Sequence, residues 1–144
     1  MPAMARIVYR LACGLLAGGQ LFFAAVAAQV VFSRQVAALP RDNPRRQLAA
    51  DLVGAMLSRL DAATLALTAV AVVCSFAYAQ RSRTLLPLIA GLFALCSAFL
   101  ITPAIHAMRS AGEVASPRFG MLHGASSILL LAEMILLAIA CAIG

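Results

Sequence analysis

The sequence has little charge and no lysine at all. Only 11% of its 144 residues are charged, whereas 64% are hydrophobic, and the mean hydropathy is +1.00. Soluble domains carry about a quarter charged residues, and a chain this short cannot bury so much apolar surface inside itself. The scarcity of charge therefore excludes an ordinary soluble domain. It predicts a single integral membrane domain over residues 1–144, with the lipid bilayer as its main partner.

The basic residues do not form a nucleic-acid surface. Eleven arginines against five acids give a net charge of +6, but Arg41, Arg45 and Arg46 form no long basic stripe with interleaved aromatic residues. The arginines lie between apolar segments, where they act as topology signals and contact anionic headgroups. We expect no nucleic-acid partner. The absence of lysine, with abundant alanine, is typical of a GC-rich bacterial genome, so we expect the bacterial inner (cytoplasmic) membrane.

Closely spaced metal ligands and catalytic signatures are also missing. The four cysteines fall one in each apolar segment, at Cys13, Cys74, Cys96 and Cys141, so no CxxC or zinc-finger spacing exists. We expect packing residues, with a soft-metal site near the N-terminal face as the alternative. There is no HExxH, no GxSxG, no glycine-rich phosphate loop and no suitably spaced carboxylate pair. We predict a protein that is not an enzyme and has no catalytic residue, cofactor or metal ligand set.

What the sequence does have is four apolar segments, each long enough to cross a bilayer. The spans are expected at about residues 7–32, 60–80, 84–108 and 118–143. Irregular backbone cannot face lipid, so each segment must be helical, and short connections make sequential helices antiparallel neighbours. The predicted fold is an all-α, integral membrane, antiparallel four-helix bundle.

Local signals refine these segments. Residues 11–32 carry no charge and exceed the ~7–15-residue core of a signal peptide, so we expect a retained span, although residues 25–27 (AVA) resemble a cleavage site. Asn43-Pro44 predicts a helix start, residues 81–83 (RSR) a tight connection, and Pro103 a kink.

Two further patterns concern packing and orientation. Gly14 and Gly18 put small residues on one face of the first span, which would let another helix approach closely. More arginines lie on the side of the two longer loops than on the side of the termini. That bias favours loops in the cytoplasm and both termini outside.

Polar side chains at membrane depth are costly, so each is a functional hypothesis. The set expected near the loop side is Gln29, Arg59, Asp61, His106, Arg109 and His123. The set expected near the midplane is Gln20, Thr64, Thr68, Ser97 and Glu133, with Ser126 on the stripe of the last helix that holds Glu133. We interpret the loop-side set as a structural network, with a metal or ligand site and headgroup exposure as alternatives.

Glu133 lies deepest among the acids. It is roughly 22 Å along its helix from Arg118, where an ionised carboxylate would be costly. We expect it to be neutral or paired and to face the interior. Gln20, with a long side chain that both donates and accepts, is its expected partner.

Two stretches resemble a known family. Residues 102–109 read TPAIHAMR, and residues 119–126 read FGMLHGAS. They are similar to the "TP-x-I-x-x-x-R" helix end and the "F-x-x-LHG-x-S" helix start of an uncharacterised bacterial four-helix membrane family, domain of unknown function 4149, akin to eukaryotic transmembrane protein 205. The resemblance implies the four-helix membrane fold and an amide near Leu130, which this sequence lacks. It implies no activity.

Function is therefore weighed on the residues alone. The leading hypothesis is a non-enzymatic assembly or structural partner acting through helix contacts with a second copy or another membrane protein. The alternative is an oligomeric transporter or permeation unit for a proton or metal ion, which Glu133, His106 and His123 favour. An enzyme acting on lipid is the third hypothesis.

Overall fold

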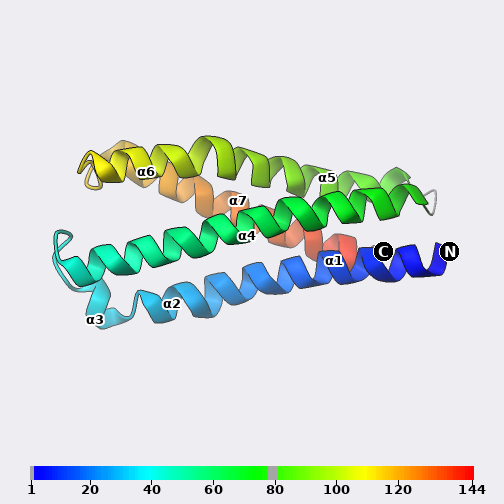
Figure 1. Cartoon of the computed structure of the whole chain (residues 1–144), viewed down its shortest axis with the longest axis horizontal. Helices are drawn as coiled ribbons and strands as arrows, with labels where there is room; N and C mark the ends of the chain where they lie inside the picture. The colour runs from blue at the N-terminus through cyan, green and yellow to red at the C-terminus, as the bar shows by residue number, and fades with distance from the viewer. Residues whose placement is uncertain (1, 78–80) are drawn as a thin grey trace.

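The described residues form a bundle of four helical rods (Figure 1). The structure is a computed structural model and describes residues 2–77 and 81–144, which contain no strand. The first rod joins α1 (Pro2–Phe22), the π-helical turn η1 (Phe23–Ala27) and α2 (Ala28–Val31). The second is α4 (Pro44–Ala77), preceded by the short α3 (Arg34–Ala37). The third joins α5 (Arg81–Cys96), the π-helical turn η2 (Ser97–Ile101) and α6 (Thr102–Ser110), and the fourth is α7 (Pro117–Ile143).

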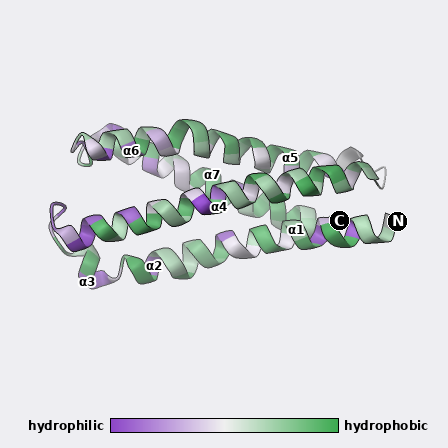
Figure 2. Cartoon of the chain, in the orientation of Figure 1, coloured by the Kyte–Doolittle hydropathy of each residue, from purple (hydrophilic) through white to green (hydrophobic). Residues whose placement is uncertain are grey.

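All four rods are long and apolar enough to cross a membrane. These spans are Ala3–Val31, Pro44–Ala77, Arg83–Ser110 and Pro117–Ile143. Large apolar side chains such as Phe22, Phe99 and Ile128 point outward, with 60–68% of each exposed, as a surface in contact with lipid requires. Figure 2 shows hydrophobic residues along most of each rod. The prediction of an all-α, multi-pass membrane bundle is confirmed.

The rods pack in a closed ring. The α1 rod contacts α4 and α7, and α5 contacts the same two helices from the other side. Both chain termini lie at one end of the bundle, which we call the terminal end (Figure 1). The opposite end carries the connections over residues 32–43 and 111–116, and we call it the loop end.

Side-chain caps fix where two of the helices begin. The Asn43 Oδ1 accepts a hydrogen bond from the Arg45 backbone N–H at 3.0 Å, which confirms the helix start predicted at Asn43-Pro44. The Ser116 Oγ accepts from the Phe119 N–H at 3.2 Å. This cap, with Pro117 as the first helical residue, starts α7 one residue before the predicted position.

The third rod departs from the sequence prediction in two places. Arg81 to Arg83 form the first turn of α5, so the prediction that they are the connection is wrong; the predicted helix end at Gln80 lies outside the described residues. Near Pro103, where the sequence predicts a kink, the rod contains the π-helical turn η2, which ends two residues before the proline. Proline has no N–H to donate to the carbonyl four residues earlier, so the α-helical bonding pattern is interrupted there.

The core occupies the terminal end. Tyr9, Cys13, Leu16 and Leu137 are fully or almost fully buried, together with small residues of α4, α5 and α7. The Tyr9 hydroxyl donates to the Arg83 carbonyl oxygen at 2.9 Å, which ties α1 to the start of α5.

Small side chains let the helices approach closely here. A Cβ on Gly14 would lie 3.2 Å from the Cys141 Sγ, whereas one on Gly18 would meet nothing within 4 Å. Gly14 is therefore used for packing α1 on α7 inside the chain. Cys13 belongs to the core, with Cys74 and Cys141 packed against it.

Candidate functional site

A layer of buried polar side chains crosses the middle of the bundle. The Gln20 Nε2 donates to the Glu133 Oε2 at 2.8 Å and lies 3.4 Å from the Thr64 Oγ1. Gln20 and Glu133 are each only 1% exposed. The structure thus places Glu133 inward, with Gln20 as its partner, as the sequence predicts.

Asp61 brings a second carboxyl group into this layer. It is 3% exposed, and the Ser97 Oγ donates to its Oδ2 at 3.4 Å. The prediction that Asp61 belongs to the loop-side set is wrong. Asp61 lies three residues before Thr64, so the two share the inward face of α4. No arginine or histidine is among the buried residues of the described ranges, so no basic side chain offsets the two acids.

Between this layer and the loop end, the rods enclose a half-open cavity of about 1480 Å³. All four rods line it, from Gln20 in the middle of the bundle up to Arg41 and Val114 in the loops. Both rods that contain a π-helical turn line the cavity just beyond that turn, through Ala28 and Thr102. The interior of the bundle is therefore open toward the loop end.

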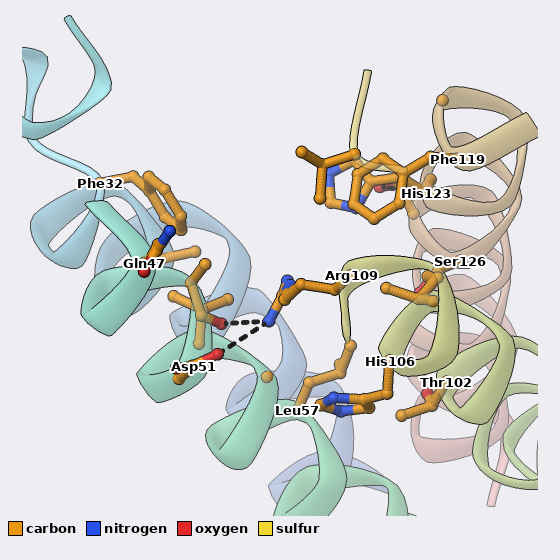
Figure 3. Close-up of a pocket in the computed structure, with 18 of the residues that line it drawn as sticks. Phe32, Gln47, Asp51, Leu57, Thr102, His106, Arg109, Phe119, His123 and Ser126 are labelled. Atoms are coloured by element: carbon orange, nitrogen blue, oxygen red, sulfur yellow. Dashed lines mark hydrogen bonds and ion pairs between the residues drawn. The ribbon is translucent and has the colours of Figure 1, made fainter. Parts of the chain in front are cut away.

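Arg109 spans the cavity near its mouth (Figure 3). It reaches from α6 toward α4, where its Nη1 donates to the Ala50 carbonyl oxygen at 3.2 Å and lies 3.3 Å from the Asp51 Oδ1. His106 lies one turn deeper, beside Gly54, where an added Cβ would come within 3.5 Å of the His106 Cε1. The imidazole therefore lies against α4 at Gly54, at ordinary van der Waals distance from where a Cβ would stand.

His123 and Ser126 line the opposite wall, on α7. The His123 ring stacks on Phe119, with centroids 6.3 Å apart and planes inclined by 8°. His123 is exposed, whereas Ser126 is 8% exposed. Of the predicted loop-side set, Gln29, His106, Arg109 and His123 therefore line one space.

Arg59 does not belong to this site. It is exposed on the outside of the bundle, in a shallow groove of about 360 Å³ lined also by Phe22, Ala27 and Met56. Residues two apart on a helix do not share a face, so Arg59 points outward where Asp61 points inward. Within the described ranges, Arg59 has no ion pair or hydrogen bond.

Three residues that line the cavity are absent from the predicted polar sets, namely Thr102 and, toward the loop end, Arg46 and Asp51. Thr102 lies four residues before His106 and seven before Arg109, so helical spacing put it on the same stripe. Its Oγ1 and the Gln20 Oε1 are both buried without a hydrogen-bond partner, and both residues line the cavity.

No metal ligand set emerges in the described part of the chain. Residues 2–77 and 81–144 contain no group of three His, Cys, Asp or Glu side chains placed to hold one ion. The cysteines near the terminal end meet at the core but do not form such a group.

Comparison with known proteins gives one match. The family described as Domain of unknown function (DUF4149) matches residues 11–114. This range covers the first rod from Leu11 onward and all of the second and third rods, and it includes the TPAIHAMR stretch. The match ends before the FGMLHGAS stretch on α7. No curated protein and no solved structure matches the chain, and the likeness to transmembrane protein 205 stays a prediction. Since the match covers well over half of the chain, the protein belongs to the DUF4149 family.

Proposed function

We propose that this chain is a non-enzymatic permeation unit of the bacterial inner membrane, in which buried carboxyl groups bind and release a proton. The observation that carries the proposal is the pair Asp61 and Glu133, buried at 3% and 1% exposure, with no basic side chain among the buried residues that the structure describes. Charged groups this deep are costly and are typical of proton and ion pathways.

The cavity supplies one half of a route. A hydronium ion in the cavity would give its proton to a carboxylate oxygen, leaving a neutral acid and a water molecule. Gln20 lines the cavity and is hydrogen-bonded to Glu133, so its amide stands between the cavity and the carboxyl group. Beyond this layer the core of the terminal end closes the interior. A full crossing therefore needs a second conformation or a second copy of the chain.

A test of this proposal is to measure proton uptake into proteoliposomes. The uptake is followed with an enclosed pH-sensitive dye, and a potassium diffusion potential drives it. We expect uptake by the wild type and its loss in Glu133→Gln, since an amide cannot release a proton. Glu113→Gln is the matched control, because Glu113 is exposed in the loop-end connection. Circular dichroism and thermal unfolding should show that both variants fold. Equal uptake by the wild type and by protein-free liposomes would refute the proposal.

Arg59 supports a second candidate function, assembly with another membrane protein. A guanidinium group facing an apolar groove fits a partner helix that carries a carboxylate at the same depth. Asp61 and Glu133 are buried within the chain, so a second copy does not offer either of them.

Native gel electrophoresis of solubilised membranes tests this candidate. The wild type should migrate as a complex, and the Arg59→Gln variant should migrate as the isolated chain. The control Arg45→Gln changes an exposed arginine outside the groove and should leave the complex intact. Identical migration of all three as the isolated chain would contradict assembly.

A further inference from the structure

The cavity is larger, and its wall more apolar, than a proton route needs. Ligand pockets typically measure roughly 300–1,000 Å³, and this cavity measures about 1480 Å³. Much of its wall is apolar, including Phe23, Leu57, Leu130 and Met134. A hydrocarbon chain suits these apolar stretches of the wall, whereas the polar residues of the same lining can hold water.

The mouth of the cavity carries an excess of positive charge. Arg41, Arg46 and Arg109 line it against Asp42 and Asp51, three cations to two anions. Arg109 is engaged by Asp51, but Arg41 and Arg46 each donate from one nitrogen to a backbone carbonyl oxygen, of Val114 at 3.2 Å and of Leu39 at 2.6 Å. An arginine has five N–H donors. These two side chains therefore keep donors for a carboxylate or phosphate group.

The floor of the cavity holds polar atoms without partners. The Gln20 Oε1 and the Thr102 Oγ1 are buried and accept no hydrogen bond from the described residues. Gln20 is 1% exposed, and its Nε2 is already used by Glu133. A buried polar atom left unpaired costs roughly 1–3 kcal/mol. An occupant that places a hydrogen-bond donor at this depth would remove that cost.

We propose that the cavity binds an amphipathic anion, with its acidic group on Arg41 and Arg46, its hydrocarbon along the apolar walls, and a hydroxyl group donating to Gln20 or Thr102. This inference is independent of the proton route, since binding needs no proton transfer. An occupied cavity would also separate Gln20 from the aqueous mouth.

The chain offers a clean optical test because it contains no tryptophan. Phe119→Trp puts a reporter on the cavity wall, and Phe99→Trp puts one on the lipid-facing surface, where Phe99 is 68% exposed. In nanodiscs of zwitterionic lipid, brominated stearate should quench the Phe119→Trp reporter saturably and the Phe99→Trp reporter only in proportion to its concentration in the bilayer.

Competition against the brominated probe then identifies the groups that bind. Oleate should displace it, ricinoleate, which adds a hydroxyl group, should bind severalfold more tightly, and oleyl alcohol should bind at least tenfold more weakly than oleate. Thr102→Val should reduce the advantage of ricinoleate. Arg46→Gln should raise the Kd for oleate at least fivefold, whereas the adjacent exposed Arg45→Gln should leave it unchanged. If Arg46→Gln disturbs the loop, Arg41→Gln provides the same test.

Two sources of the anion are separated by the composition of the nanodisc. Displacement of the probe by phosphatidylglycerol in the disc identifies a membrane lipid as the occupant, and no displacement identifies a free fatty acid. Equal, non-saturable quenching of both reporters would overturn the inference, as would equal Kd values for Arg45→Gln and Arg46→Gln. Binding measured in Glu133→Gln keeps this result separate from proton uptake.

Discussion

The two ends of the bundle contrast although the same four rods build both. At the terminal end, alanines such as Ala71, Ala90 and Ala140 face inward at 0% exposure, and the helices close around Tyr9 and Leu137. At the loop end the inward positions carry longer polar side chains, and a cavity remains. Small residues permit close helix approach in a membrane. The difference teaches that the composition of the inward stripe, more than the topology, decides where the bundle is closed.

The two ends of the bundle should face different compartments, and this is the largest effect expected. Reporter fusions of alkaline phosphatase and of green fluorescent protein at Met1 and Gly144 should give the same, outside location. A fusion in the Arg41 to Arg46 loop should give the cytoplasmic one, an all-or-none difference. Opposite locations for the two termini would mean three spans, as cleavage after Ala27 would produce.

Packing should matter far more at the terminal end. Leu137→Ala removes a side chain that is 0% exposed and should lower the free energy of unfolding by about 2–5 kcal/mol. Leu130→Ala, on the same helix, borders the existing cavity and should cost well under half as much. Unfolding with a denaturing detergent in mixed micelles measures both. Equal losses would mean that the loop end is packed as tightly as the core.

In the polar layer between the two ends, Gln20 and Glu133 should contribute to stability as an energetically coupled pair. Gln20→Leu and Glu133→Leu each leave the other side chain buried without its 2.8 Å hydrogen bond, which should cost about 1–3 kcal/mol apiece. The double variant should cost less than the sum, because both partners are then apolar. Glu133→Gln should be nearly neutral for folding. Strict additivity in this double-mutant cycle would contradict the coupling.

Glycine substitutions should give the smallest contrast. A Cβ on Gly91 would lie 3.1 Å from the Thr68 Oγ1, which is held by the Thr64 carbonyl oxygen at 2.6 Å. Gly91→Ala should therefore cost about 1 kcal/mol. Gly124→Ala, at the loop end, would meet nothing within 4 Å and should not destabilise the protein. Thermal unfolding of the two variants under one condition checks this, and a loss in Gly124→Ala equal to that in Gly91→Ala would contradict it.

The fold could be predicted because lipid leaves a segment of this length and hydropathy only one structure. The Gln20 and Glu133 pair followed from depth and chemistry alone, since few groups at the midplane can satisfy a carboxyl. The depth of a residue in the membrane does not say, however, whether its side chain points into the bundle or out of it. Arg59 and Asp61 are two residues apart at nearly one depth, yet one faces outward and the other inward.

The cavity itself could not be predicted, because the sequence gives the types of the residues but not which of them face inward together at one depth of the bundle. The stripe of Thr102, His106 and Arg109 carried the available signal. The sequence favours a structural network for this set, with a metal or ligand site as the alternative, whereas the arginines and the apolar walls around the cavity support the binding of an amphipathic anion.

The π-helical turns have a consequence for how this sequence can change. A π-helical turn accommodates one extra residue, and each residue turns an α-helix by about 100°. Deleting a single residue from η2 would restore regular winding and swing His106 and Arg109 away from the cavity. The apolar length of the rod would hardly change. The extra residue in each π-helical turn therefore sets the rotation of the helix that follows it, α2 or α6. A one-residue deletion can abolish the site in a protein that still inserts into the membrane.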